Sequence, residues 1–284
     1  MDQRETVLCS PVRTAIGTFD GSLKAVPATE LGATAVRAVL TRSGLKGSDI
    51  GTVVMGNVVQ AGNKMNPARQ SAVNGGIPVD VPAMTVNRVC GSGAQAIVSA
   101  AQEVMLGMLD GAIAGGMENM DLAPYLLGGG RWGYRLGDAQ IYDSILRDGL
   151  NDAFSGEHSG WHTEDLVKSR QITREAQDRW AERSQKRFSA AQEAGKFKDE
   201  ITSVELHGCK GPKVFDKDEQ PAEYDVRESR QAPTSLSQGW NNHGGKCAGA
   251  EQWSIRDDRC GTELGRKTRA QADGATGFIW GGRR

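Results

Sequence analysis

The chain has 284 residues, enough for one large domain or two modest ones, and a formal net charge of -1 at pH 7. This balance creates no overall field that would attract nucleic acid or an anionic membrane. The first residues are polar and no apolar run approaches membrane-spanning length, which argues against a signal peptide and a membrane span. We therefore expect a cytoplasmic protein that binds neither nucleic acid nor membrane.

The cysteine pattern predicts free thiols. Five cysteines lie far apart, and none forms a CxxC pair: Cys9, Cys90, Cys209, Cys247 and Cys260. An odd number at wide spacing argues against both a disulfide framework and a zinc site. Free thiols in a reducing compartment fit this pattern better.

The first 120 residues alternate between strand-like and helix-like patterns. Short runs rich in apolar and β-branched residues predict strands at 5–12, 49–59, 81–90 and 110–120. Apolar residues at helical spacing predict one helix that ends at Gly44 and a second, buried helix over 93–109. Such alternation predicts an α/β fold, with a parallel or mixed sheet covered by helices.

Regular patterning is lost over 121–150, where glycines and aromatic residues interleave and a loop is expected. Two polar helices are predicted to follow, the first over 163–170. The second is predicted to begin at Thr173, which acidic and amide residues follow, and to end at Gly195. A strand is predicted over 199–206.

The last stretch, 222–284, differs from the rest. It holds only six Val, Ile, Leu and Phe residues and eight arginines, with many glycines and no periodicity. A chain with less than about 20% of these apolar types usually cannot build a core, so we expect a disordered tail. An arginine-rich interaction segment is the alternative.

Cys90 is the strongest candidate for chemistry. It follows an apolar run and precedes a predicted helix, with Gly91, Ser92 and Gly93 directly after it. A thiol at a helix N-terminus feels the positive end of the helix dipole, which favours the thiolate nucleophile. Small neighbours let a ligand approach the sulfur. A lone cysteine is more often a buried structural residue, and the residues alone leave that alternative open.

The histidines offer weaker candidates. His158 and His162 stand four residues apart and could serve as acid/base groups or ligands, but Gly160 weakens a helix between them and no third ligand is evident. No metal site is therefore expected, and His162 is interpreted as a surface residue. The segment Gly115–Asn119 could cradle a phosphate, but a tight turn at the end of a strand accounts for its two glycines as well.

Several segments between about residues 6 and 221 resemble thiolases, in the order of that family. They include PVRTAIGTFDGSL, VMGNVVQAGNKMNPARQSA, VPAMTVNRVCGSGAQAI, AGGMENM and ITREAQDRWAERSQKRFSAAQEAG. The chain is most similar to members that transfer acetyl groups on coenzyme A. The resemblance implies a thiolase-like layered α/β fold. Residues 1–120 would form the domain that carries the nucleophile, and 121–221 a helical loop domain with coenzyme A and oligomer contacts.

The resemblance also implies a mechanism. Cys90 would form an acyl-enzyme with a coenzyme A thioester, and its backbone N–H would help to hold the oxyanion. His158 matches a family histidine that lines the coenzyme A site, although Ser159 replaces the methionine that usually follows it. Acyl-CoA and coenzyme A would be the substrates, without a permanently bound cofactor, and the intact family forms homo-oligomers.

The chain departs from the family after Pro221. No GHP, NEAF or CxGGG motif of the family's second half occurs. When codons for Ala222 onward are read one base later, synonymous choices spell the family's continuation, and Trp240 and Trp253 both then force the glycine that the family carries. We expect a frameshift near Pro221, a truncated fold and a non-native tail over 222–284. The alternative function is a catalytically inactive fragment or pseudogene product.

Overall fold

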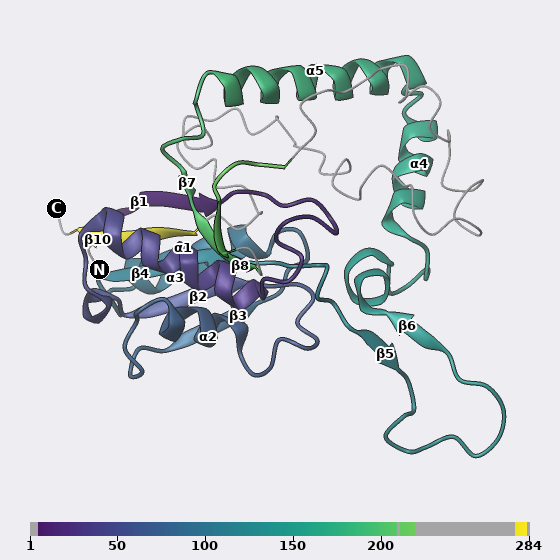
Figure 1. Ribbon diagram of the computed structural model, residues 1–284, viewed down its shortest axis with the longest axis horizontal. Coiled ribbons are helices and arrows are strands. Elements are labelled where there is room, and N and C mark those ends of the chain that lie inside the picture. The colour runs from purple at the N-terminus through teal and green to yellow at the C-terminus, as the bar shows by residue number, and fades with distance from the viewer. Residues whose placement is uncertain (1–4, 209–210, 220–275, 283–284) are drawn as a thin grey trace. The chain divides into compact units, whose positions relative to one another are not determined.

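The computed structural model describes residues 5–208, 211–219 and 276–282 (Figure 1). The chain divides into two compact units. Among the described residues, the first comprises 5–145, 200–208, 211–219 and 276–282, and the second comprises 146–199. This division differs from the expected domains 1–120 and 121–221, because the described residues of 121–145 and 200–219 both belong to the first unit. The expected limits of a loop domain stay a prediction.

A six-stranded sheet forms the centre of the first unit, in the order β3-β2-β4-β10-β1-β7. Its strands are β1 (Glu5–Thr14), β2 (Thr52–Gly56), β3 (Ala83–Val86), β4 (Gly111–Gly116), β7 (Ile201–Thr202) and β10 (Thr276–Gly282). β2 pairs in parallel with β3 and β4, and β1 in parallel with β7. β10 runs antiparallel to both of its neighbours, β4 and β1.

Helices cover both faces of this sheet. α1 (Ala28–Ser43) and α2 (Pro67–Asn74) pack on one face, where Val36 and Val39 meet Val53 and Ile113 in a buried cluster. α3 (Ser92–Met105) packs on the other face against a second cluster that contains Val54. Val53 and Val54 face opposite clusters because successive strand side chains alternate. The layered α/β fold predicted from the sequence is confirmed.

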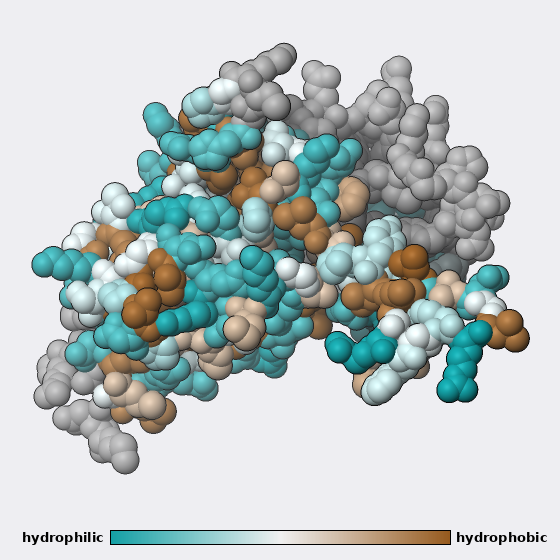
Figure 2. Space-filling view, turned by 60° about the horizontal axis from the view of Figure 1, so that its bottom comes forward, coloured by the Kyte–Doolittle hydropathy of each residue, from teal (hydrophilic) through white to brown (hydrophobic). Residues whose placement is uncertain are grey.

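Two predictions for the first unit need correction. The strand expected over 81–90 ends at Val86, and the next four residues form a turn. The helix predicted to be buried over 93–109 is buried on one face only: within α3, Ala96 and Ala100 are fully buried, whereas Val98 is 49% exposed. Figure 2 shows further hydrophobic residues in separate brown patches on the surface.

Shorter elements complete both units. The segment expected to be a loop contains a two-stranded antiparallel ribbon of β5 (Tyr125–Leu127) and β6 (Ile141–Asp143). A second antiparallel ribbon, of β8 (Val204–Gly208) and β9 (Gly211–Phe215), follows β7. The remaining short elements are η1 (Gly47–Asp49) and the π-helix η2 (Ile145–Leu150). The second unit holds α4 (Ser159–Ser169) and α5 (Arg174–Glu193). The Thr173 side chain caps α5 by accepting from the Ala176 N–H at 3.2 Å, and the predicted beginning of this helix is confirmed.

The C-terminal strand corrects the prediction of a disordered tail in part. That prediction lies outside the described residues over 222–275, but Thr276–Gly282 form β10 in the middle of the sheet. The sequence of this strand includes Phe278, Ile279 and Trp280, which are strand-forming residue types. β1 and β4 each present a row of backbone groups to it, and pairing satisfies them. The low content of Val, Ile, Leu and Phe, averaged over residues 222–284, does not show such a short run of strand-forming residues.

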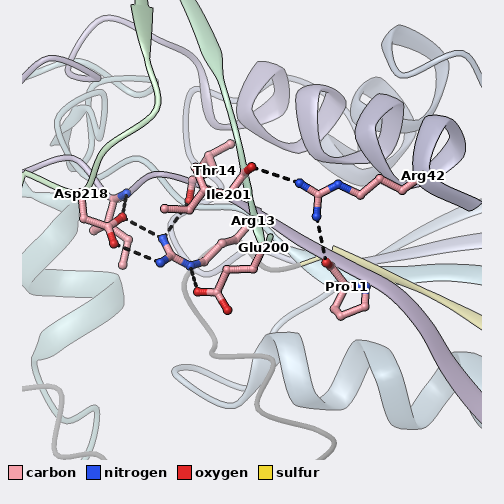
Figure 3. A network of polar contacts seen from close by, with 8 residues as sticks. Pro11, Arg13, Thr14, Arg42, Glu200, Ile201 and Asp218 are labelled. Atoms are coloured by element: carbon pink, nitrogen blue, oxygen red, sulfur yellow. Dashed lines mark hydrogen bonds and ion pairs between the residues drawn. The ribbon is translucent and has the colours of Figure 1, made fainter. Parts of the chain in front are cut away.

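A buried ion pair fastens the segment Glu200–Glu219 to the end of β1 (Figure 3). Two nitrogens of Arg13 donate to the two carboxylate oxygens of Asp218 at 2.7 and 3.0 Å, and the third donates to Glu200 at 2.7 Å. Both Arg13 and Asp218 are about 5% exposed or less. Burial lowers the pKa of Arg13, but the hydrogen bonds to Asp218 and Glu200 and the negative charges of these two residues together raise it, so the guanidinium stays charged.

Replacing Asp218 by Asn should destabilise the first unit strongly. The variant leaves the buried Arg13 charge without its main counter-ion, and breaking a buried pair on one side typically costs about 3–5 kcal/mol. Urea unfolding would measure the change. Asp20→Asn is the matched control, because Asp20 pairs with Lys24 on the exposed surface and its loss should leave stability nearly unchanged. Equal effects of the two variants would contradict the assignment.

Replacing Ile279 by Pro should destabilise the sheet, because proline removes a backbone donor from a strand that is paired on both sides. A lower urea midpoint is expected. Thr276→Pro is the control, since proline is tolerated at the first residue of a strand. If Ile279→Pro unfolds at the same urea concentration as the unaltered chain, β10 does not form part of the sheet in solution.

Candidate active site

Three neighbouring strands end side by side at one edge of the sheet. In the parallel register of β2, β3 and β4, Gly56 lies opposite both Val86 and Gly116. The segments that follow these strands therefore leave the sheet together. The carboxyl edge of a parallel sheet is where α/β proteins usually bind their ligands. Cys90 lies in one of these three segments.

A tight turn carries Cys90 from β3 into α3. Val89, directly before it, has a φ of 50°, a left-handed conformation that is rare for a β-branched residue. The Asn87 side chain accepts a hydrogen bond from the Val89 N–H at 2.9 Å. The Ser92 hydroxyl accepts from the Arg88 N–H at 2.8 Å and donates to the Val89 carbonyl at 2.6 Å. Such local hydrogen bonds hold a backbone shape that would otherwise relax.

Gly56 lets this turn lie close to the sheet. A Cβ atom at Gly56 would come within 2.7 Å of Ser92 and within 2.8 Å of the Gly93 nitrogen. Any side chain there would push the beginning of α3 away from β2. Ser92 is 5% exposed, whereas Cys90, two residues earlier, is exposed.

The position of Cys90 suits a nucleophile. Gly91 is the N-cap residue of α3, so the thiol precedes the unpaired N–H groups at the start of that helix. An exposed sulfur at this place can reach a ligand that also contacts the N–H groups at the start of the helix. This geometry excludes the buried structural cysteine that the sequence had left open.

Glu118, which lies just beyond the end of β4, binds the segment that follows β2. The Glu118 carboxylate accepts from the Val58 N–H at 2.7 Å, from the Val59 N–H at 3.3 Å and from the Asn57 amide at 2.8 Å. Burial raises the pKa of Glu118 above its ordinary value, and these three hydrogen bonds oppose that shift. A partly buried carboxylate at this edge therefore has its oxygens aimed at backbone and amide donors.

His158 lies in the second unit, at the beginning of α4. Its Nδ1 accepts a hydrogen bond from the Gly160 N–H at 3.0 Å, so this ring nitrogen carries a lone pair. Burial lowers the pKa of His158, which favours the same neutral ring. His162 lies within α4, where its Nε2 is 3.0 Å from the Ser155 hydroxyl. The expected contact of His158 with coenzyme A stays a prediction.

The segment Gly115–Asn119 forms a turn at the end of a strand. Gly115 and Gly116 end β4, and the Asn119 side chain donates to the carbonyls of Leu23 and Val26.

Across the described ranges, no group of three or more His, Cys, Asp and Glu residues could hold a metal ion. None of the helices in that part of the chain is long and apolar enough to cross a membrane.

Sequence reasoning missed the residues that shape the site: Gly56, Asn57, Asn87, Val89 and Glu118. Each lies within the last four residues of a strand predicted from the sequence, and the observed strands end at or before these residues. Asn57 and Asn87 directly follow the last residues of β2 and β3.

Comparison with known proteins gives a consistent result. The family described as "Thiolase, N-terminal domain" matches residues 6–232, which continues beyond Pro221. An acetyl-CoA acetyltransferase of Pseudomonas aeruginosa is 47% identical over 219 residues, which cover 77% of this chain and 56% of that protein. Beta-ketothiolase BktB of Cupriavidus necator is 52% identical over 217 residues, which cover 76% and 55%.

A solved structure agrees with these relatives. The crystal structure of the Bacillus anthracis acetyl-CoA acetyltransferase matches with a TM-score of 0.77 and 36% identity, over 80% of this chain and 58% of that one. The chain thus spans about half the length of the curated relatives that it matches. Together with the exposed cysteine between β3 and α3, the family match over most of the chain places this protein in the thiolase family.

Proposed function

We propose that this chain is an acyltransferase of the thiolase type, which transfers acyl groups, and acetyl groups in particular, between coenzyme A thioesters. The observation that carries the proposal is the exposed Cys90 on a constrained turn at the N-terminus of α3. Relatives named acetyl-CoA acetyltransferase support the acyl group and its carrier. Cys90, its turn and α3 all lie in the part of the chain that matches the family.

Cys90 would act by covalent catalysis. The Cys90 thiol gives up its proton, its thiolate attacks the carbonyl carbon of an acyl-CoA, and the bond to the coenzyme A sulfur breaks, so that coenzyme A leaves as a thiol with that proton. The acyl–sulfur bond at Cys90 then breaks as the acyl group passes to the sulfur of coenzyme A or to the α-carbon of a second acyl-CoA, and the proton that this acceptor loses returns to the Cys90 sulfur. The Cys90 N–H, at the beginning of α3, is the donor that would stabilise the oxyanion.

The remaining parts of the proposal follow from family membership. Acyl-CoA and coenzyme A are the proposed partners, with no permanently bound cofactor, and His158 would contribute to the coenzyme A site. A homo-oligomer is the proposed assembly. The free thiols of Cys9 and Cys90 support a reducing compartment such as the cytoplasm.

The second candidate is a catalytically inactive fragment. This candidate is supported by the sequence, because the motifs that thiolases carry in their second half have no counterpart in these residues. A cysteine nucleophile without an activating base loses much of its reactivity toward a thioester. The two candidates differ in turnover and agree on the architecture around Cys90.

Activity should depend on both Cys90 and the family's second half. The test measures thiolysis of acetoacetyl-CoA by coenzyme A, for the chain as given and for the chain restored to the family frame after Pro221 and extended. The extended form should turn over faster by on the order of 10³-fold or more, because catalytic groups that act as a unit are lost together. Cys90→Ser is the control in both forms and should abolish turnover.

Two outcomes would contradict this account. Full turnover by the chain as given would show that another base near Cys90 suffices. A folded, extended chain without turnover would contradict the proposed function, and it would also show that the missing second half does not explain a lack of activity.

A further inference from the structure

A line of hydrogen bonds leads from Glu118 to the turn that carries Cys90. The Glu118 carboxylate fixes the Val58 N–H at 2.7 Å, and the carbonyl of the same residue, Val58, accepts from the Asn87 side chain at 3.3 Å. The Asn87 oxygen in turn accepts from the Val89 N–H at 2.9 Å. Val89 is the residue with the left-handed backbone, and Cys90 follows it.

The neighbouring contacts make this line rigid at its origin. The Asn57 side chain is 1% exposed and donates both to Glu118 and to the Met117 carbonyl, at 2.8 and 3.2 Å. The Asn57 N–H donates to the Val86 carbonyl at 3.1 Å. The three segments beyond β2, β3 and β4 are thereby joined, and the carboxylate lies where they meet.

A carboxylate is chemically required at this position. Glu118 faces three N–H donors, and an ionised carboxylate only accepts hydrogen bonds. An amide of the same size would offer one oxygen and one NH₂ group, and the NH₂ group would face a donor. The Val58 peptide or the Asn57 side chain would then lose its partner.

We propose that Glu118 is a positioning residue, which holds the Cys90 turn in its reactive shape through the Val58 peptide and the Asn87 side chain. The inference rests on the proposed function of Cys90 as the nucleophile. Without this support, Val89 can relax toward an ordinary backbone conformation, and the thiol then leaves its place at the N-terminus of α3. Glu118 itself does not touch the reacting atoms.

The test measures how fast iodoacetamide alkylates Cys90 in the folded chain, by quenched peptide mass mapping, with Cys9 and free glutathione as reference thiols. Glu118→Gln and Asn87→Ala should each slow Cys90 about fivefold, which corresponds to the loss of a helix-terminus interaction. The double variant should slow it no further than the slower single variant, because both break one line of contacts. Asp121→Asn is the matched control, since its carboxylate contacts the Asp20 N–H and not this line.

Urea unfolding of each variant separates positioning from stability. A Glu118→Gln variant that is less stable but alkylates Cys90 at the unaltered rate overturns the proposal. If this variant does not fold, Asn87→Ala decides, because the Asn87 side chain is at the surface. An unchanged rate there also overturns it. If Cys90 of the unaltered chain reacts no faster than glutathione, the assignment of the nucleophile fails, which is a separate result.

Discussion

The parallel, in-register pairing of β2 with β3 and β4 is the constraint on which the site depends. It places Gly56, Val86 and Gly116 at one level of the sheet, so the three segments that follow must share a small space. Their backbone groups leave the sheet ladder at that level and need new partners. Asn57, Asn87 and Glu118 provide many of these partners, and the turn around Cys90 takes its shape from them.

A second set of contacts brings distant parts of the chain to the same sheet. Among the described residues, β4 is connected to β1 through β10, which pairs with both strands from the far end of the sequence. Arg13 and Asp218 connect the end of β1 to the segment that precedes Pro221. The Glu219 N–H donates to the Ile16 carbonyl at 2.9 Å, so contacts of this segment continue to its last described residue.

The sequence predicted what local patterns encode. Helical spacing and a terminal glycine located the helix that ends at Gly44, and a capping threonine located the start of α5. The placement of Cys90 before a helix was also predictable, since a glycine-rich stretch interrupts the apolar pattern there. The end of β3 was missed because Val89, a strand-forming residue type, lies in the turn and not in the strand.

Contacts between distant residues could not be predicted in this way. The hydrogen bond from Asn57 to Glu118 joins residues 61 positions apart, and no local pattern links them. The prediction of a fully buried helix gave too little weight to Gln95, Gln102 and Glu103, and Val98 on the same helix is 49% exposed. β10 was not predicted, because the apolar content was averaged over the whole polar stretch 222–284. Each of these features depends on which strands lie side by side.

The central claim is that this architecture makes Cys90 an acyl acceptor. Its most direct test is to mix the chain with acetyl-CoA, quench in acid, and map the modified peptide by mass spectrometry. The account predicts one acetyl group on Cys90, attached as a thioester that hydroxylamine removes, and none in Cys90→Ser. An unmodified Cys90 in a folded chain, or acetylation of Cys9 in its place, would contradict it.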